Sequence, residues 1–190
     1  MPAADCPADL LDATVVLVRS DAGQGLTQVE RLLGDYPRDA RLHFLRGSLL
    51  ASAQRYDHAQ AAMAAAVGLA PAFALARFQL GLLQLTSRDP AAAKATWAPL
   101  LETDAEGALP AFARGLACLS ENRFDEAARL LKAGLALNHD NPALSAEMTL
   151  ILDGLERAPG QAPASAPTAE APVSAAHLLL QQYSTNATRH

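Results

Sequence analysis

Five histidines and two cysteines are the side chains of this sequence best suited to bind a transition metal or to act as nucleophiles. Zinc sites need ligands at short fixed spacings, such as two cysteines separated by two residues or two histidines four residues apart on one helix. Neither spacing occurs, and a glycine-rich phosphate loop and a Gly-x-Ser-x-Gly turn are also missing. The sequence therefore predicts a protein that is not an enzyme and indicates no metal and no cofactor.

The other reactive side chains have simpler explanations. Asp57, Asp125 and Glu126 stand where helices are expected to begin, and there a carboxylate caps backbone N–H groups and offsets the helix dipole. Cys118 lies within an apolar run, so we expect a small buried side chain. Two cysteines do not make a disulfide framework, and reduced thiols are the simpler interpretation.

A period of 34 residues organises the chain. Gly47, Gly81 and Gly115 are separated by this step, as are three phenylalanines and three alanines. The members of these two sets are Phe44, Phe78, Phe112, Ala59, Ala93 and Ala127. A fixed period of this length is typical of a stack of identical supersecondary units.

Each unit is predicted to be a pair of helices. Apolar residues make up 51% of the chain, aromatic residues only 5%, and alanine and leucine dominate; both rank high in helix propensity. In the first clear copy, one helix runs over 40–51, a break follows at Gln54–Arg55, and a second helix begins near Tyr56 and stops at Pro71. Glycine inside a helix costs about 1 kcal/mol relative to alanine, so we expect the three periodic glycines to allow close approach of the paired helix.

These residues resemble the tetratricopeptide repeat family, which places a small residue or glycine at position 8, alanine at 20 and 27, a bulky residue at 24 and proline at 32 of each repeat. The first clear copy fits this pattern with Gly47, Ala59, Met63, Ala66 and Pro71. The third copy departs from it with Gly134 at position 27, and the first and third copies have arginine, Arg46 and Arg114, rather than leucine at position 7. The resemblance implies an all-α, right-handed solenoid of stacked helix-turn-helix repeats.

The predicted organisation has three parts. Residues 1–157 form the solenoid, with a degenerate repeat at 6–39, three clear repeats at 40–73, 74–107 and 108–141, and a capping helix at 142–157. In the degenerate repeat we expect helices near 8–19 and 26–34. Residues 158–173 are rich in proline and alanine and are predicted to be a disordered linker. Residues 174–190 are predicted to hold a short helical docking segment.

In the resembled family, positions 5, 9 and 12 of each first helix face the inner groove. Apolar side chains occupy most of these positions here, where the carboxylate-binding version of the family needs lysine, asparagine and arginine. We therefore expect the groove to bind an apolar peptide or helix; the alternative is that these side chains pack against neighbouring helices or are covered by the chain itself. The predicted groove residues are Phe44, Phe78, Leu82, Leu85, Phe112, Leu116 and Leu119.

Four apolar side chains follow the linker, namely Leu178, Leu179, Leu180 and Tyr183. A helix this short is not stable alone, so the segment is predicted to be a docking peptide for the groove of its own chain, the groove of a neighbouring chain or an unrelated protein. Docking in the groove would compete with a partner. The alternative is an inert tail.

Charge and hydropathy exclude other classes. A net charge of −5 without a basic stripe argues against nucleic acid as a partner. No segment approaches the roughly 20 apolar residues of a membrane span, and the start of the sequence lacks the features of a signal peptide. We expect a cytoplasmic, bacterial protein that acts as a protein-binding scaffold or adaptor. The alternatives are a chaperone for a secreted or pilus-type client and a self-associating structural protein.

Overall fold

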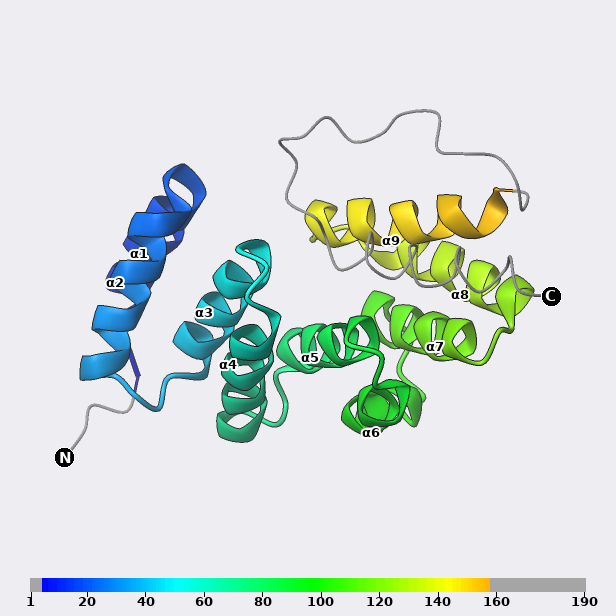
Figure 1. Cartoon of the computed structure of the whole chain (residues 1–190), viewed down its shortest axis with the longest axis horizontal. Coiled ribbons are helices and arrows are strands. Elements are labelled where there is room, and N and C mark those ends of the chain that lie inside the picture. The colour runs from blue at the N-terminus through cyan, green and yellow to red at the C-terminus, as the bar shows by residue number, and fades with distance from the viewer. Residues whose placement is uncertain (1–4, 158–190) are drawn as a thin grey trace. The chain divides into compact units, whose positions relative to one another are not determined.

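A computed structural model describes residues 5–157 of the chain, and within them it contains nine helices and no strand (Figure 1). This confirms the prediction of an all-α repeat fold. The helices are α1 (Ala8–Ser20), α2 (Ala22–Asp35), α3 (Ala40–Ser52), α4 (Tyr56–Leu69), α5 (Ala74–Thr86), α6 (Pro90–Leu101), α7 (Ala108–Ser120), α8 (Phe124–Leu137) and α9 (Pro142–Glu156). None of them is long and apolar enough to cross a membrane.

Side-chain caps set several helix starts. The Asp89 carboxylate accepts a hydrogen bond from the backbone N–H of Ala92 at 2.9 Å, and Pro90 occupies the first turn of α6, where its missing N–H costs nothing. Asn141 caps α9 in the same way through Leu144 N–H. Asp21 caps α2 through Gln24 N–H, and therefore α2 begins at Ala22, four residues before the predicted start.

The second residue beyond the end of α3, α5 and α7 adopts a left-handed conformation. Gln54, Arg88 and Asn122 have φ values of 60°, 64° and 61°, and they are spaced by the same 34 residues as the glycines. In each turn the next N–H bonds back five residues, as from Arg55 to Leu50 O at 2.8 Å. This is the Schellman termination, which usually uses glycine.

Each periodic glycine faces a large side chain of the paired helix. A Cβ added to Gly47 would stand 2.9 Å from Met63 Cγ, and one added to Gly115 would stand 3.1 Å from Leu131 Cγ. At Gly81 an added Cβ would overlap the indole of Trp97. The expected reason for these glycines, close approach of the paired helix, is thus confirmed at all three.

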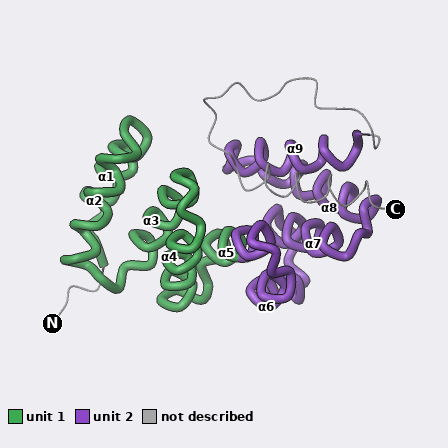
Figure 2. Tube along the Cα trace, viewed as in Figure 1, with its two compact units in different colours: residues 1–80 green, residues 81–190 purple. Residues whose placement is uncertain are grey.

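The chain divides into two compact units, residues 1–80 and 81–190, with the boundary inside α5 (Figure 2). In the first unit α1 packs on α2, α2 on α3, and α3 on α4. In the second unit α6 packs on α7, α7 on α8, and α8 on α9. The glycine contacts join α3 to α4 and α7 to α8.

A buried aspartate ties the N-terminal segment to the start of α3. Asp39 is 1% exposed, and its carboxylate accepts hydrogen bonds from Cys6 N–H at 2.8 Å and from Arg41 Nη2 at 2.6 Å. Arg41 Nη2 also donates to Cys6 O at 2.8 Å. Cys6 is buried in a small apolar cluster with Leu32 and Leu42, so the hydrogen bonds of Asp39 and Arg41 anchor one member of that cluster to the start of α3.

Candidate binding surfaces

The predicted groove residues lie in α3, α5 and α7, and six of the seven are fully or almost fully buried. Phe78, Leu82, Leu85, Phe112, Leu116 and Leu119 are each at most 3% exposed. These six side chains therefore present little surface in this structure, and a partner would reach them only after whatever covers them moved. Their role in binding stays a prediction.

Phe44 is the exception, because it is only half-buried. Its ring lies against that of Phe73, which comes from the turn before α5, with the ring centroids 5.0 Å apart at an angle of 45°. Of the seven predicted groove residues, it is the one whose ring is in part accessible.

The contact made by Phe112 explains its burial. A Cβ added to Gly134 of α8 would overlap the ring of Phe112, so this ring fills the space between α7 and α8. Gly134 departs from the alanine of the resembled family at position 27, and this departure was the signal in the sequence that a large side chain lies opposite.

An open cleft of about 420 Å³ crosses α7 between α6 and α8 in the second unit. We call it the α6–α8 cleft. Apolar side chains of Leu101, Ala117 and Leu130 line it together with Cys118. The remaining lining residues are charged: Lys94, Arg114, Glu121, Arg123, Glu126 and Arg129.

Ion pairs link these charges across three helices. Lys94 Nζ of α6 lies 2.5 Å from Glu121 Oε1 at the end of α7. Arg123 Nε contacts Glu121 Oε2 at 3.0 Å, and Arg123 Nη1 contacts Glu126 Oε2 at 3.3 Å. The hydrogen bond from Lys94 is the largest influence on Glu121 and holds the pKa of its carboxyl below the ordinary value.

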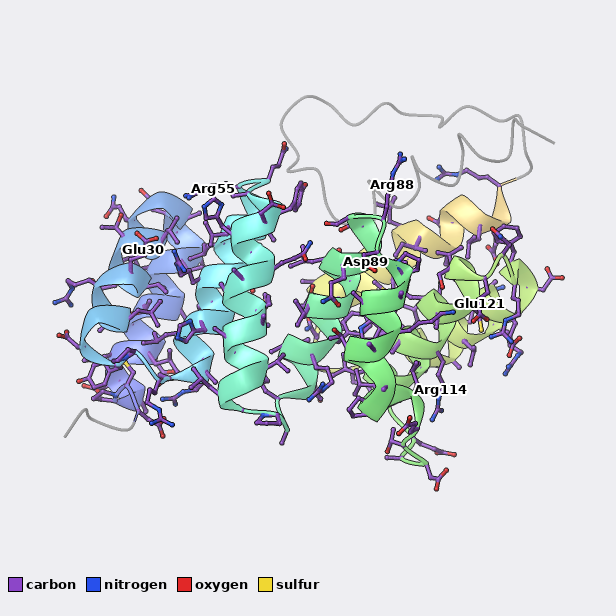
Figure 3. The ribbon with its side chains drawn as sticks, turned by 60° about the horizontal axis from the view of Figure 1, so that its bottom comes forward. Glu30, Arg55, Arg88, Asp89, Arg114 and Glu121 are labelled. Atoms are coloured by element: carbon purple, nitrogen blue, oxygen red, sulfur yellow. The ribbon has the colours of Figure 1, made fainter. Side chains whose placement is uncertain are left out.

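Arg114 and Cys118 are partly structural. Arg114 donates to the carbonyls of Leu101 and Thr103, and Figure 3 shows it beside the loop that joins α6 to α7. Cys118 is buried, as expected, and its Sγ accepts a hydrogen bond from Arg123 Nη2 at 2.8 Å. Burial raises the pKa of the Cys118 thiol more than Arg123 lowers it, so this cysteine is not an activated nucleophile.

A second open pocket of about 440 Å³ lies between α8 and α9. Phe124, which is 46% exposed, lines it with Leu155, and Lys132 pairs with Glu156 at 2.6 Å on its rim. Arg129 borders both this pocket and the α6–α8 cleft.

The remaining candidates form no reactive site among residues 5–157. No group of three or more metal-binding side chains occurs there, and both cysteines in that part of the chain are buried thiols. The ring of His43 contacts Pro37 O at 2.9 Å. Asp57, Asp125 and Glu126 lie in first helix turns, as expected, but the predicted capping is not seen, because neither α4 nor α8 starts with a side-chain cap. Glu126 pairs with Arg123 instead. The predicted docking segment, Leu178, Leu179, Leu180 and Tyr183, lies outside the described residues.

Comparison with known proteins gives a family and a fold. Residues 12–74 and 78–142 match the model of the tetratricopeptide repeat. A structure of MamA, residues 41 to the end, from Desulfovibrio magneticus RS-1 is 15% identical, covers 78% of this chain and 93% of its own, and has a TM-score of 0.56. The MamA RS-1 ArsTM double mutant has the same identity and coverage and a TM-score of 0.55. At this identity the likeness shows the fold alone. No curated protein sequence matches the chain.

Proposed function

The chain belongs to the tetratricopeptide repeat family, and we propose that it is a non-catalytic scaffold that binds a protein partner. Repeat folds of this kind stack helix hairpins into extended surfaces that suit protein binding. The side chains capable of chemistry support the same proposal, because the described histidines and cysteines do not converge. We place the scaffold in the cytoplasm.

The first proposed contact surface is the inner face of the first helices. The observation that carries it is Phe44, a large apolar ring on α3 that is only half-buried. Aromatic side chains that pack in part against their own protein and in part against a partner often dominate binding energy. The partner segment for this face is an apolar peptide or an amphipathic helix.

Affinity capture with two matched variants tests this proposal. Phe44→Ala and Phe73→Ala remove opposite halves of the same ring contact, so their effects on stability should be similar. Only Phe44 belongs to the predicted inner face. We expect Phe44→Ala to lose the partner that the wild type captures and Phe73→Ala to keep it. Equal capture by the wild type and both variants would exclude this face, and loss from both variants would mark a folding effect.

Regulation by the C-terminal segment is the finer part of the proposal. Leu178, Leu179, Leu180 and Tyr183 supply an apolar element after a linker long enough to reach back to the repeats. Removal of residues 174–190 is expected to strengthen partner capture if the segment competes for the same surface. Unchanged capture by the shortened chain would contradict competition.

A further inference from the structure

We propose that the α6–α8 cleft binds an acidic segment of a partner protein, with carboxylates placed around at least one apolar side chain. This inference rests on the proposed scaffold function but uses a different surface. The cleft is bordered by α6 and α8, the second helices of their hairpins, whereas the predicted groove lies on the first helices α3, α5 and α7.

The charge of the cleft opposes that of the chain. Four cations and two carboxylates line it, although the whole protein carries a net charge of −5. The α6–α8 cleft is thus a local positive site on an acidic protein. Such a site attracts a segment rich in aspartate and glutamate and repels a basic one.

Two of the cations, Lys94 and Arg129, have N–H donors that remain available to a ligand. Arg129 is 69% exposed and reaches Glu126 only at 4.0 Å, so its five N–H groups are largely available. Lys94 is 38% exposed and directs one of its three N–H bonds to Glu121. Both therefore retain capacity for carboxylates of a partner.

Arg123 is held in place before any partner arrives. Its Nε, Nη1 and Nη2 atoms contact Glu121, Glu126 and Cys118 respectively. An ordered guanidinium loses less side-chain entropy on binding than a mobile one. Glu126 also occupies the space between Arg123 and Arg129, so a partner carboxylate competes with it for both.

The repeat itself supplies an internal comparison. One and two periods away from Arg129, the corresponding residues are Ala95 and Ala61. For Lys94 the corresponding residues are Gln60 and Ala128. The helix hairpin therefore forms without a charge at either position, and packing does not explain why the cations gather in this one cleft.

The apolar lining sets the second requirement on the partner. Leu101 and Leu130 are half-buried and stand among the charges. A leucine or similar side chain in the acidic segment would cover them and exclude water, which strengthens the surrounding ion pairs. The α6–α7 loop of a second copy, with Glu102, Asp104 and Glu106 exposed, is the competing occupant.

Fluorescence anisotropy with the full chain provides the test. The probe is a labelled peptide of about twelve residues that alternates aspartate and glutamate with leucine, and its control has asparagine and glutamine in place of the acids. We expect the acidic peptide to bind at least tenfold more tightly at low salt and to weaken as salt screens the charges. Equal affinity for the two peptides would overturn the proposal.

Three variants assign the binding to the cleft. The Lys94→Ala, Arg129→Ala double variant is expected to raise the Kd of the acidic peptide at least tenfold. The control is Arg31→Ala, Arg38→Ala in the first unit, which changes the net charge equally and should raise the Kd less than twofold. Glu126→Gln, which releases Arg123 and Arg129, should tighten binding severalfold. A damaged fold would not produce that gain, so Glu126→Gln keeps the test decisive even if the double variant is unstable.

The outcomes separate this inference from the proposed function. Equal losses of peptide affinity in the Lys94→Ala, Arg129→Ala variant and in the Arg31→Ala, Arg38→Ala variant would show that only net charge matters. That result would overturn the assignment of binding to the α6–α8 cleft. A concentration-dependent dimer that Lys94→Ala, Arg129→Ala abolishes would replace the partner with a second copy. Failure of Phe44→Ala to change partner capture would reject the inner face alone and would leave acidic-peptide binding intact.

Discussion

Phe112 of α7 packs directly against Gly134 of α8. The ring of Phe112 occupies the space in which a Cβ on Gly134 would stand, and Phe112 is completely buried. A residue that the repeat pattern would have as alanine is therefore fixed as glycine by the size of its neighbour across the hairpin.

Gly134→Ala is expected to destabilise the protein, although it restores the family residue and improves helix propensity. Overpacking a buried contact costs about 1 to 3 kcal/mol, and the propensity gain is about 1 kcal/mol, so we expect a net loss of up to about 2 kcal/mol. Urea denaturation followed by circular dichroism measures it. Adding Phe112→Leu should make the combined loss smaller than the sum of the two single losses.

Gly68→Ala is the matched control for that substitution. Gly68 lies in α4, is exposed, and has no atom within 4 Å of the added Cβ among those that could obstruct it. The same change should therefore raise stability by up to about 1 kcal/mol. If Gly134→Ala stabilised the protein as Gly68→Ala does, the tight packing of Phe112 against Gly134 would be contradicted.

Gln54→Gly and Arg88→Gly should each stabilise the protein. Both residues are exposed and have φ near 60°, a conformation that costs most side chains about 1 to 2 kcal/mol. Glycine removes this cost but loses more chain entropy on folding, which leaves an expected gain of about 0.5 to 1 kcal/mol. Asn122→Gly should change little, because asparagine tolerates this conformation. Thermal and urea midpoints measure the three, and a larger gain at Asn122 would argue against relief of strain.

Replacing Asp39 should weaken the fold in a manner that depends on pH. Burial raises the pKa of Asp39, but hydrogen bonds from Arg41 and Cys6 outweigh it, so the pKa lies below the ordinary 3.8. A lowered pKa gives stability that is complete above the unfolded-state value and is lost as pH falls through the folded-state value. We expect Asp39→Asn to cost about 2 to 3 kcal/mol at pH 7 and less at pH 3.

Urea midpoints at pH 7, 5 and 3 check that expectation. Asp35→Asn, at an exposed carboxylate at the end of α2, is the control and should stay within about 0.5 kcal/mol at each pH. A cost for Asp39→Asn that does not change with pH would show that shape rather than charge explains the role of Asp39.

Asp39→Asn should also make Cys6, but not Cys118, more accessible to reagents. Cys6 and Cys118 are each 3% exposed, and burial is the main cause that raises the pKa of both thiols, so both should react slowly with iodoacetamide in the folded protein. Asp39 holds the Cys6 backbone. We expect Asp39→Asn to speed alkylation of Cys6 at least tenfold and to leave Cys118 within twofold, as measured by mass spectrometry. Equal acceleration of both would indicate general unfolding.

The repeat made much of the fold predictable from the sequence. Gly47, Gly81 and Gly115 recur because each faces a side chain across a hairpin, so their spacing carried three-dimensional information. The local caps were also visible, since Asp89 stands directly before Pro90. Position within the repeat did not reveal the left-handed turns at Gln54 and Arg88, because neither residue type favours that conformation.

The α6–α8 cleft could not be predicted, since its charges have no common spacing. Lys94 and Glu121 are 27 residues apart and meet only because α6 packs on α7. The burial of Phe112 was not predicted either, although Gly134 was a sign of it. The position of Phe112 in the repeat of the family suggested a side chain on the inner surface. The space beside Gly134 that its ring fills depends on how α7 and α8 pack against each other.

The side chains that pack against the periodic glycines determine which parts of the chain can be exchanged between repeats. Met63, Trp97 and Leu131 occupy the same place opposite their glycines, yet they differ widely in volume. An exchange of single helices between repeats would put a mismatched side chain in a fitted space, whereas a whole hairpin moves together with its own counterpart. The hairpin is therefore the natural unit for duplication, shuffling and transplantation in this protein.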